Sequence, residues 1–199
     1  GKFGPPDNPF AFGELPMMPG GSIPRFSHNV IAVNGSAMPD AWQGRLLGAD
    51  PLHRHLVLSE RSVRGASFTT RDIGFPVKNS DVAFRPVYMA NAPDGSLLIA
   101  DFYERYIAHG QHYQSQIGPT SGRVYRLRAK IKPLSADNEL SAKTNGQLIG
   151  LLAEPNKWHR QTAVRLLGQR ATAVTNAKLR KQIKAETGLA ALHGLWALH

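Results

Sequence analysis

Two pairs of histidines have the spacing of metal ligands. His53 and His55 are two residues apart, so both imidazoles would face one side of an extended strand. His109 and His112 are three residues apart, which places them on one turn of a helix. Either pair could donate two nitrogens to an ion such as Zn²⁺, although neither has a carboxylate or a third ligand at a recognisable spacing. We therefore rank His109 and His112 first as a metal site, and His53 and His55 second.

The sequence lacks the residues and motifs that several other kinds of chemistry require. It contains no Cys, which excludes disulfides, thiolate metal sites, iron–sulfur clusters and covalently attached haem within this segment. No Gly-rich phosphate loop precedes a helix, no Gly-x-Ser-x-Gly motif occurs, and the carboxylates are scattered singly. A hydrolase or a kinase is therefore not expected.

The region that holds these histidines is predicted to be all-β. Residues 1–26 alternate Pro or Gly with single apolar side chains and predict an extended loop. Residues 27–132 contain short β-prone runs separated by turn residues, which is typical of a sandwich, barrel or propeller. The predicted strands are 28–33, 45–50, 53–58, 67–72, 85–90, 96–101 and 122–128.

The clearest hairpin is the segment NAPDGSLLIADFY. Pro93 sets φ for the first turn position, Asp94 can bond the backbone of its own turn, and Gly95 accepts a positive φ. The strands on either side should therefore pair in antiparallel fashion.

After a polar linker at 133–145, the apolar period lengthens to that of helices. Residues 146–199 predict four short amphipathic helices, with Asn156 capping the second and Gly188 ending the third. The predicted inward side chains are Leu148, Leu151 and Leu152, then Trp158, Ala163, Leu166 and Leu167, then Leu179 and Ile183, and finally Leu192, Leu195 and Trp196.

The net charge of +10 is concentrated in this helical region. Residues 141–199 contain nine Lys and Arg against two Glu. No aromatic side chains interleave with these cations, so we interpret them as a solvated face and do not expect nucleic acid as a partner. No apolar run approaches the ~18 residues that a membrane-spanning helix needs.

Several runs resemble a known family. AWQGRLLGADPLHRHLVL, FRPVYMANAPDGSLLIADFY and SGRVYRL resemble the closing blades of glucose/sorbosone dehydrogenase-like β-propellers. LLAEPNKWHRQTAVRLLGQR and LHGLWALH resemble the HEAT-type repeats that follow such propellers in large membrane-bound dehydrogenases of planctomycete-type bacteria. The resemblance implies an all-β propeller fragment followed by all-α, HEAT-like repeats. Seven strands are fewer than two four-stranded blades, so the remaining blades, or another chain, should complete the sheet structure.

The resemblance also implies an activity. Related propellers are oxidoreductases that bind pyrroloquinoline quinone and calcium and oxidise a sugar or alcohol, and a c-type haem domain or cytochrome accepts the electrons. Arg85 matches the arginine that contacts the quinone, and Asp101 and Tyr103 could face the same channel. The matching turn of the preceding blade, Asn34–Pro39, holds no lysine, and the catalytic residue is unknown. A periplasmic or extracytoplasmic location with membrane association is implied.

An alternative remains for each of these assignments. Arg85 could brace a loop through an Asp or a backbone carbonyl, Asp101 could cap a turn, and Tyr103 could pack with its hydroxyl bonded. The chain would then be a fragment of a non-catalytic binding or scaffold module in a larger complex.

Overall fold

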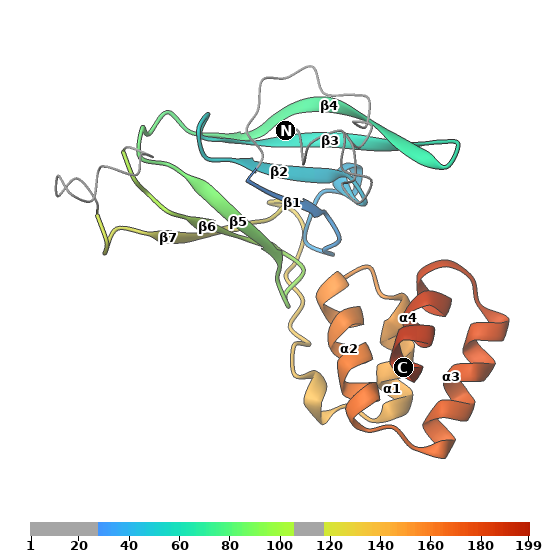
Figure 1. The fold of residues 1–199 in the computed structure, drawn as a ribbon. Coiled ribbons are helices and arrows are strands. Elements are labelled where there is room, and N and C mark those ends of the chain that lie inside the picture. Colours follow the sequence, from blue (N-terminus) through green and yellow to red (C-terminus); the bar gives the residue numbers. More distant parts are fainter. Residues whose placement is uncertain (1–27, 106–117) are drawn as a thin grey trace, which may run out of the picture.

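The computed structural model describes residues 28–105 and 118–199, with two β-sheets followed by a group of helices (Figure 1). All seven strands precede residue 130, and α1 to α4 all follow residue 140. The predicted order, β-structure first and helices afterwards, is confirmed. The described residues form two open sheets and do not close a propeller.

The first sheet is an antiparallel meander in the order β1-β2-β3-β4. Its strands are β1 (Asn29–Ala32), β2 (Leu46–Asp50), β3 (His55–Arg64) and β4 (Ser67–Lys78). The register of β2 and β3 places Asp50 directly opposite His55. Strand β3 starts two residues later than predicted, so His53 lies in the turn between β2 and β3.

The second sheet has the order β5-β6-β7, with β5 (Pro86–Asn91), β6 (Leu97–Asp101) and β7 (Arg123–Leu127). The predicted PDG turn joins β5 to β6, and Asp94 and Gly95 have their expected roles. Asp94 Oδ1 accepts the backbone N–H of Ser96 at 3.0 Å. Gly95 has φ 82° and its carbonyl accepts the N–H of Ala37, so the turn is also tied to the first sheet.

The core of the β-region lies between the two sheets. Buried side chains from both sheets form one cluster, which comprises Val33, Met38, Leu47, Ala49, Leu56, Leu58, Met89, Leu97 and Ile99. Because alternate residues of a strand face opposite sides, this cluster occupies only one face of each sheet. The opposite face of the second sheet does not belong to this core, and its residues Tyr88 and Val124 are exposed.

The helical region consists of α1 (Asn145–Gly150), α2 (Lys157–Gln169), α3 (Ala173–Ala185) and α4 (Gly188–Leu198). The side chain of Asn156 accepts the backbone N–H of Trp158 at 3.0 Å, so the predicted cap of α2 is confirmed. Leu148, Leu152, Ala163, Leu167 and Leu179 are fully buried in one core. None of the helices in the described part of the chain is long and apolar enough to span a membrane.

Helix α4 corrects two predictions. Gly188 begins α4 and does not end α3, because its φ of 64° suits the sharp entry into the last helix. The predicted inward residues Leu192, Leu195 and Trp196 are 39%, 56% and 51% exposed. Ala190, His193, Gly194 and Ala197 are buried in their place. Gly194 allows a close approach of α3, because a Cβ at this position would lie only 3.2 Å from the Ile183 side chain.

Candidate functional site

Arg85 immediately precedes β5, and its side chain reaches two loops. Nε donates to the carbonyl oxygen of Glu104 at 2.8 Å, and Nη2 donates to that of Arg105 at 2.9 Å. Nη1 donates to the carbonyl oxygen of Pro51 at 2.9 Å and lies 3.4 Å from that of Leu52. The residue is 8% exposed. Arg85 therefore braces loops through backbone carbonyls, the alternative that the sequence had left open.

Asp101 and Tyr103 lie beside Arg85 at the same end of the second sheet. Asp101 Oδ1 accepts the backbone N–H groups of Arg85 at 2.7 Å and of Tyr103 at 2.9 Å. Tyr103 has φ 52°, and its hydroxyl donates to Asp81 at 3.0 Å. The Arg123 guanidinium lies 3.5 Å from the centre of its ring. The structure thus brings the three predicted residues together.

The Arg85 side chain is poorly placed to bind an anionic quinone, because its nitrogens already donate to backbone carbonyls. A bound anion needs cationic donors that are free to reach it. The Arg85 guanidinium is buried and donates from all three nitrogens to backbone oxygens. Quinone binding through Arg85 is thus not available in this conformation, and quinone binding by a complete propeller stays a prediction.

A second cluster lies beside the Pro51 loop that Arg85 holds. Asp50 Oδ2 is 2.8 Å from Nδ1 of His53 and 3.4 Å from Nε2 of His55. The two imidazoles are stacked, with ring centres 5.5 Å apart. Asp50 and His55 are buried, whereas the His53 side chain is 48% exposed. One carboxylate and two imidazoles therefore meet at a point that solvent can reach from one side.

Burial of His55 favours its neutral form. Burial lowers the pKa of His55 below its ordinary value, and the nearby His53 and Lys78 act in the same direction, against the Asp50 carboxylate that raises it. A neutral imidazole has a free nitrogen lone pair. The ring also packs against Phe75, with ring centres 4.2 Å apart, which limits its rotation.

Sequence reasoning missed the carboxylate of this cluster. We expected no acidic ligand near His53 and His55, but Asp50 lies three residues before His53 and meets both rings. The signal was the spacing Asp-x-x-His-x-His across a tight turn. A turn reverses the chain, so residues at its two ends come together. The other predicted metal pair, His109 and His112, lies outside the described residues.

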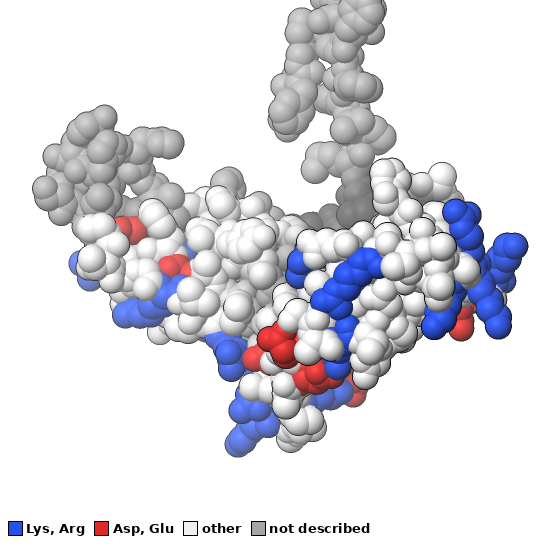
Figure 2. Space-filling model, turned by 90° about the horizontal axis from the view of Figure 1, so that it is seen from below, with Lys and Arg blue, Asp and Glu red and all other residues white. Residues whose placement is uncertain are grey.

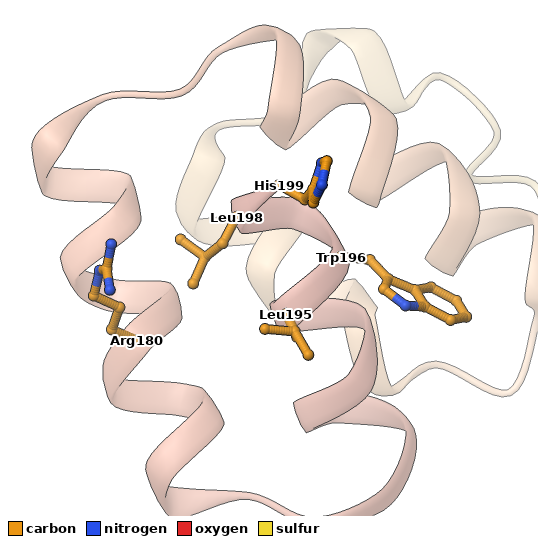
Figure 3. A pocket seen from close by; sticks show the side chains of 5 residues that line it. All are labelled: Arg180, Leu195, Trp196, Leu198 and His199. Atoms are coloured by element: carbon orange, nitrogen blue, oxygen red, sulfur yellow. The ribbon is translucent and has the colours of Figure 1, made fainter.

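The charged surface of the helical region is spread over its exterior. Figure 2 shows Lys and Arg at several places on this face, with one group at the right-hand end of the molecule. The exposed cations of α3 are Lys178, Arg180, Lys181 and Lys184. A shallow pocket between α3 and α4 is lined by Arg180, Leu195, Trp196, Leu198 and His199. Trp196 points away from Arg180 (Figure 3), so the two do not form an aromatic and cationic pair.

The β-region matches a known family of protein domains. Residues 27–131 match the family described as a domain of unknown function, DUF7133. No curated protein and no solved structure matches the chain. The match covers both sheets and ends before the helices.

Proposed function

We propose that this chain, which belongs to the DUF7133 family, contributes β-sheets to a larger propeller. In that assembly it serves as a binding or scaffold module. The observation that carries this proposal is the outer face of the second sheet. Tyr88 of β5, Ala100 of β6 and Val124 of β7 form one cross-strand row. Tyr88 is 59% and Val124 is 70% exposed.

The occupant we propose for this face is a further antiparallel sheet. The inner face of the second sheet already packs on the first sheet through Met89 and Ile99. A sheet with apolar residues on both faces is typically covered on both. The helices α1 to α4 would continue from this β-assembly as HEAT-type repeats.

The interactions of Arg85 support a structural role for this end of the sheet. Its guanidinium ties the loop at Pro51 to the backbone at Glu104 and Arg105. Such bonds hold loops in one arrangement, which a recognition surface requires.

Photo-cross-linking tests the proposal on the protein as it is expressed in its source cells. A benzophenone amino acid at position 88 or 124 should capture peptides from predicted β-strands outside this chain's two sheets. The matched control is the same probe at Val63, which is 77% exposed at the tip of the β3–β4 hairpin and should capture nothing. Capture equal to the control, or capture of a helical segment only, would overturn the proposal.

A quinone-dependent dehydrogenase acting on a sugar or alcohol is the second candidate. The observation that favours it is Arg123, whose exposed guanidinium lies on the ring of Tyr103. A cation held on an aromatic ring can contact an anionic ligand from a defined position. Pyrroloquinoline quinone with calcium should then bind the complete protein, and Arg123→Ala should weaken binding about tenfold or more. Equal binding by the variant, or no binding by the natural protein, excludes this candidate.

A further inference from the structure

We propose that Asp50, His53 and His55 bind a divalent first-row transition-metal ion, with Zn²⁺ as the reference ion. Each residue offers one ligand atom, and the three atoms lie within 4.8 Å of one another. Two imidazoles and one carboxylate are donors that Zn²⁺ and its neighbours in the series accept. The site goes beyond the proposed docking role, because that role rests on a different face of the β-region.

The distances suit tetrahedral coordination. With metal–ligand bonds of about 2.0 to 2.1 Å, two ligand atoms of a tetrahedron lie about 3.3 Å apart. Asp50 Oδ2 and His55 Nε2 are already 3.4 Å apart. His53 Nδ1 is closer to Asp50 Oδ2, at 2.8 Å, and its ring is nearly parallel to that of His55. His53 must therefore move outward by about half an ångström and turn, so that its lone pair and that of His55 point to one ion. The exposure of His53 leaves it room to do so.

The backbone already orients the two buried ligands. Asp50 Oδ1 accepts the N–H groups of Leu52 and His53, both at 3.0 Å, so Oδ2 points toward the imidazoles. Asp50 and His55 form a directly opposed pair of β2 and β3. Arg85 holds the intervening turn through the carbonyl oxygen of Pro51, so it acts as a positioning residue.

His55 supplies an independent indication of a ligand. Its side chain is 6% exposed, and within residues 28–105 and 118–199 its Nε2 makes no well-formed hydrogen bond, although Asp50 Oδ2 lies 3.4 Å away at ion-pair distance. A buried nitrogen without a well-formed hydrogen bond is costly, and one carboxylate oxygen at this distance offsets only part of that cost. A metal ion between Nε2 and the Asp50 carboxylate would remove that cost.

The site would be open and of moderate affinity. Three protein ligands leave a fourth position on the solvent side of His53, where water or an external ligand can bind. Lys78 is paired with His55 across β3 and β4, and its positive charge opposes a second cation. We therefore expect weaker binding than at a closed structural zinc site.

Calorimetric titration of the full 199-residue chain with ZnCl₂ tests the proposal. His53→Ala should lower the affinity at least about tenfold, and its fold should persist because His53 is exposed. The matched control is His199→Ala, which removes another exposed histidine and should leave the affinity unchanged. NMR of ¹⁵N-labelled histidines should show zinc-dependent shifts at Nδ1 of His53 and Nε2 of His55. Zn²⁺ should also raise the melting temperature of the natural chain more than that of His53→Ala.

Three results would each overturn the proposal. The first is a dissociation constant for Zn²⁺ weaker than about 1 mM in the natural chain. The second is equal affinity in His53→Ala and the natural chain. The third is binding that disappears only when His109 and His112 are replaced. The exposed His53→Ala and the NMR shifts decide the question without a variant at His55, whose replacement could unfold the chain because His55 is buried.

Discussion

Nη1 of Arg85 donates a hydrogen bond to the carbonyl oxygen of Pro51 at 2.9 Å, although the two residues are 34 positions apart in the chain. This bond connects the start of the second sheet to the β2–β3 turn of the first. The same guanidinium reaches the segment after β6 through Glu104 and Arg105. One cation thus holds two loops by their backbone.

Replacing Arg85 should destabilise the fold. Arg85→Ala leaves four backbone carbonyls without their donor, those of Pro51, Leu52, Glu104 and Arg105. We expect a loss of about 2 to 4 kcal/mol in the free energy of unfolding. Urea denaturation measures the loss. Arg71→Ala is the control, because Arg71 is largely exposed and pairs with Glu60 at the surface, so its removal should cost less than about 1 kcal/mol. Similar losses for the two variants would show that the Arg85 bonds contribute little.

Asn156 should couple the helices to the β-region. Its Oδ1 caps α2, and its Nδ2 donates to the carbonyl oxygen of Pro93 at 2.7 Å. Asn156→Ala should cost about 1 kcal/mol for the cap and about 1 to 3 kcal/mol for the unpaired carbonyl. Asn156→Asp keeps the acceptor for the cap but places a carboxylate oxygen against the Pro93 carbonyl, so it should unfold at a lower temperature than the natural chain although the cap is kept.

The control for Asn156 is Thr172→Ala. Thr172 caps α3 through the N–H of Thr175, and its hydroxyl also bonds to the Thr175 hydroxyl within the same helix, so its loss should cost only about 1 kcal/mol. If Asn156→Asp is as stable as the natural chain, the bond to Pro93 does not join the two regions.

Gly95 should tolerate no side chain. Its φ of 82° alone costs an L-residue about 1 to 2 kcal/mol. A Cβ would also lie 2.2 Å from Ser36 Oγ and 3.0 Å from the backbone nitrogen of Ala37. Gly44→Ala is the matched control, since Gly44 has φ 73° and nothing within 4 Å of a Cβ. The larger loss of unfolding free energy should be in Gly95→Ala; equal losses would mean that the contact relaxes without cost.

His193 should make the helical region sensitive to acid. Burial lowers the pKa of His193 below its ordinary value, and the charge of Arg160 lowers it further, against a hydrogen bond to the carbonyl oxygen of Leu189. Below about pH 6.5 the unfolded chain therefore binds a proton more readily than the folded chain does. The folded chain keeps its full stability with respect to His193 above that pH. This stability is lost as the pH falls toward the lower pKa that His193 has in the folded chain.

Urea titrations at pH 7.5 and 5.5 measure this effect. His193→Gln should flatten the loss of stability between the two values, whereas His199→Gln, at an exposed position, should not change it. An unchanged pH dependence in His193→Gln would assign the acid sensitivity to other groups.

The local elements could be predicted from the sequence because their signals are local. Each of the seven predicted strands overlaps an observed one, and the roles of Asp94, Gly95 and Asn156 were foreseen from residue type. Turn and cap residues act on the backbone within a few positions, so their effect can be predicted from a short stretch of sequence.

The tertiary structure decided which side chains meet and which face becomes the core. Helix α4 has leucines along one side, but it buries the side with Ala190, Gly194 and Ala197, because only small residues allow α3 to come close. The donors of Arg85 go to carbonyls in loops far away in the chain. The Asp50 carboxylate joins the two histidines only because the β2–β3 turn brings it back to them. Contacts between distant residues depend on how the elements pack, and no short stretch of sequence contains that information.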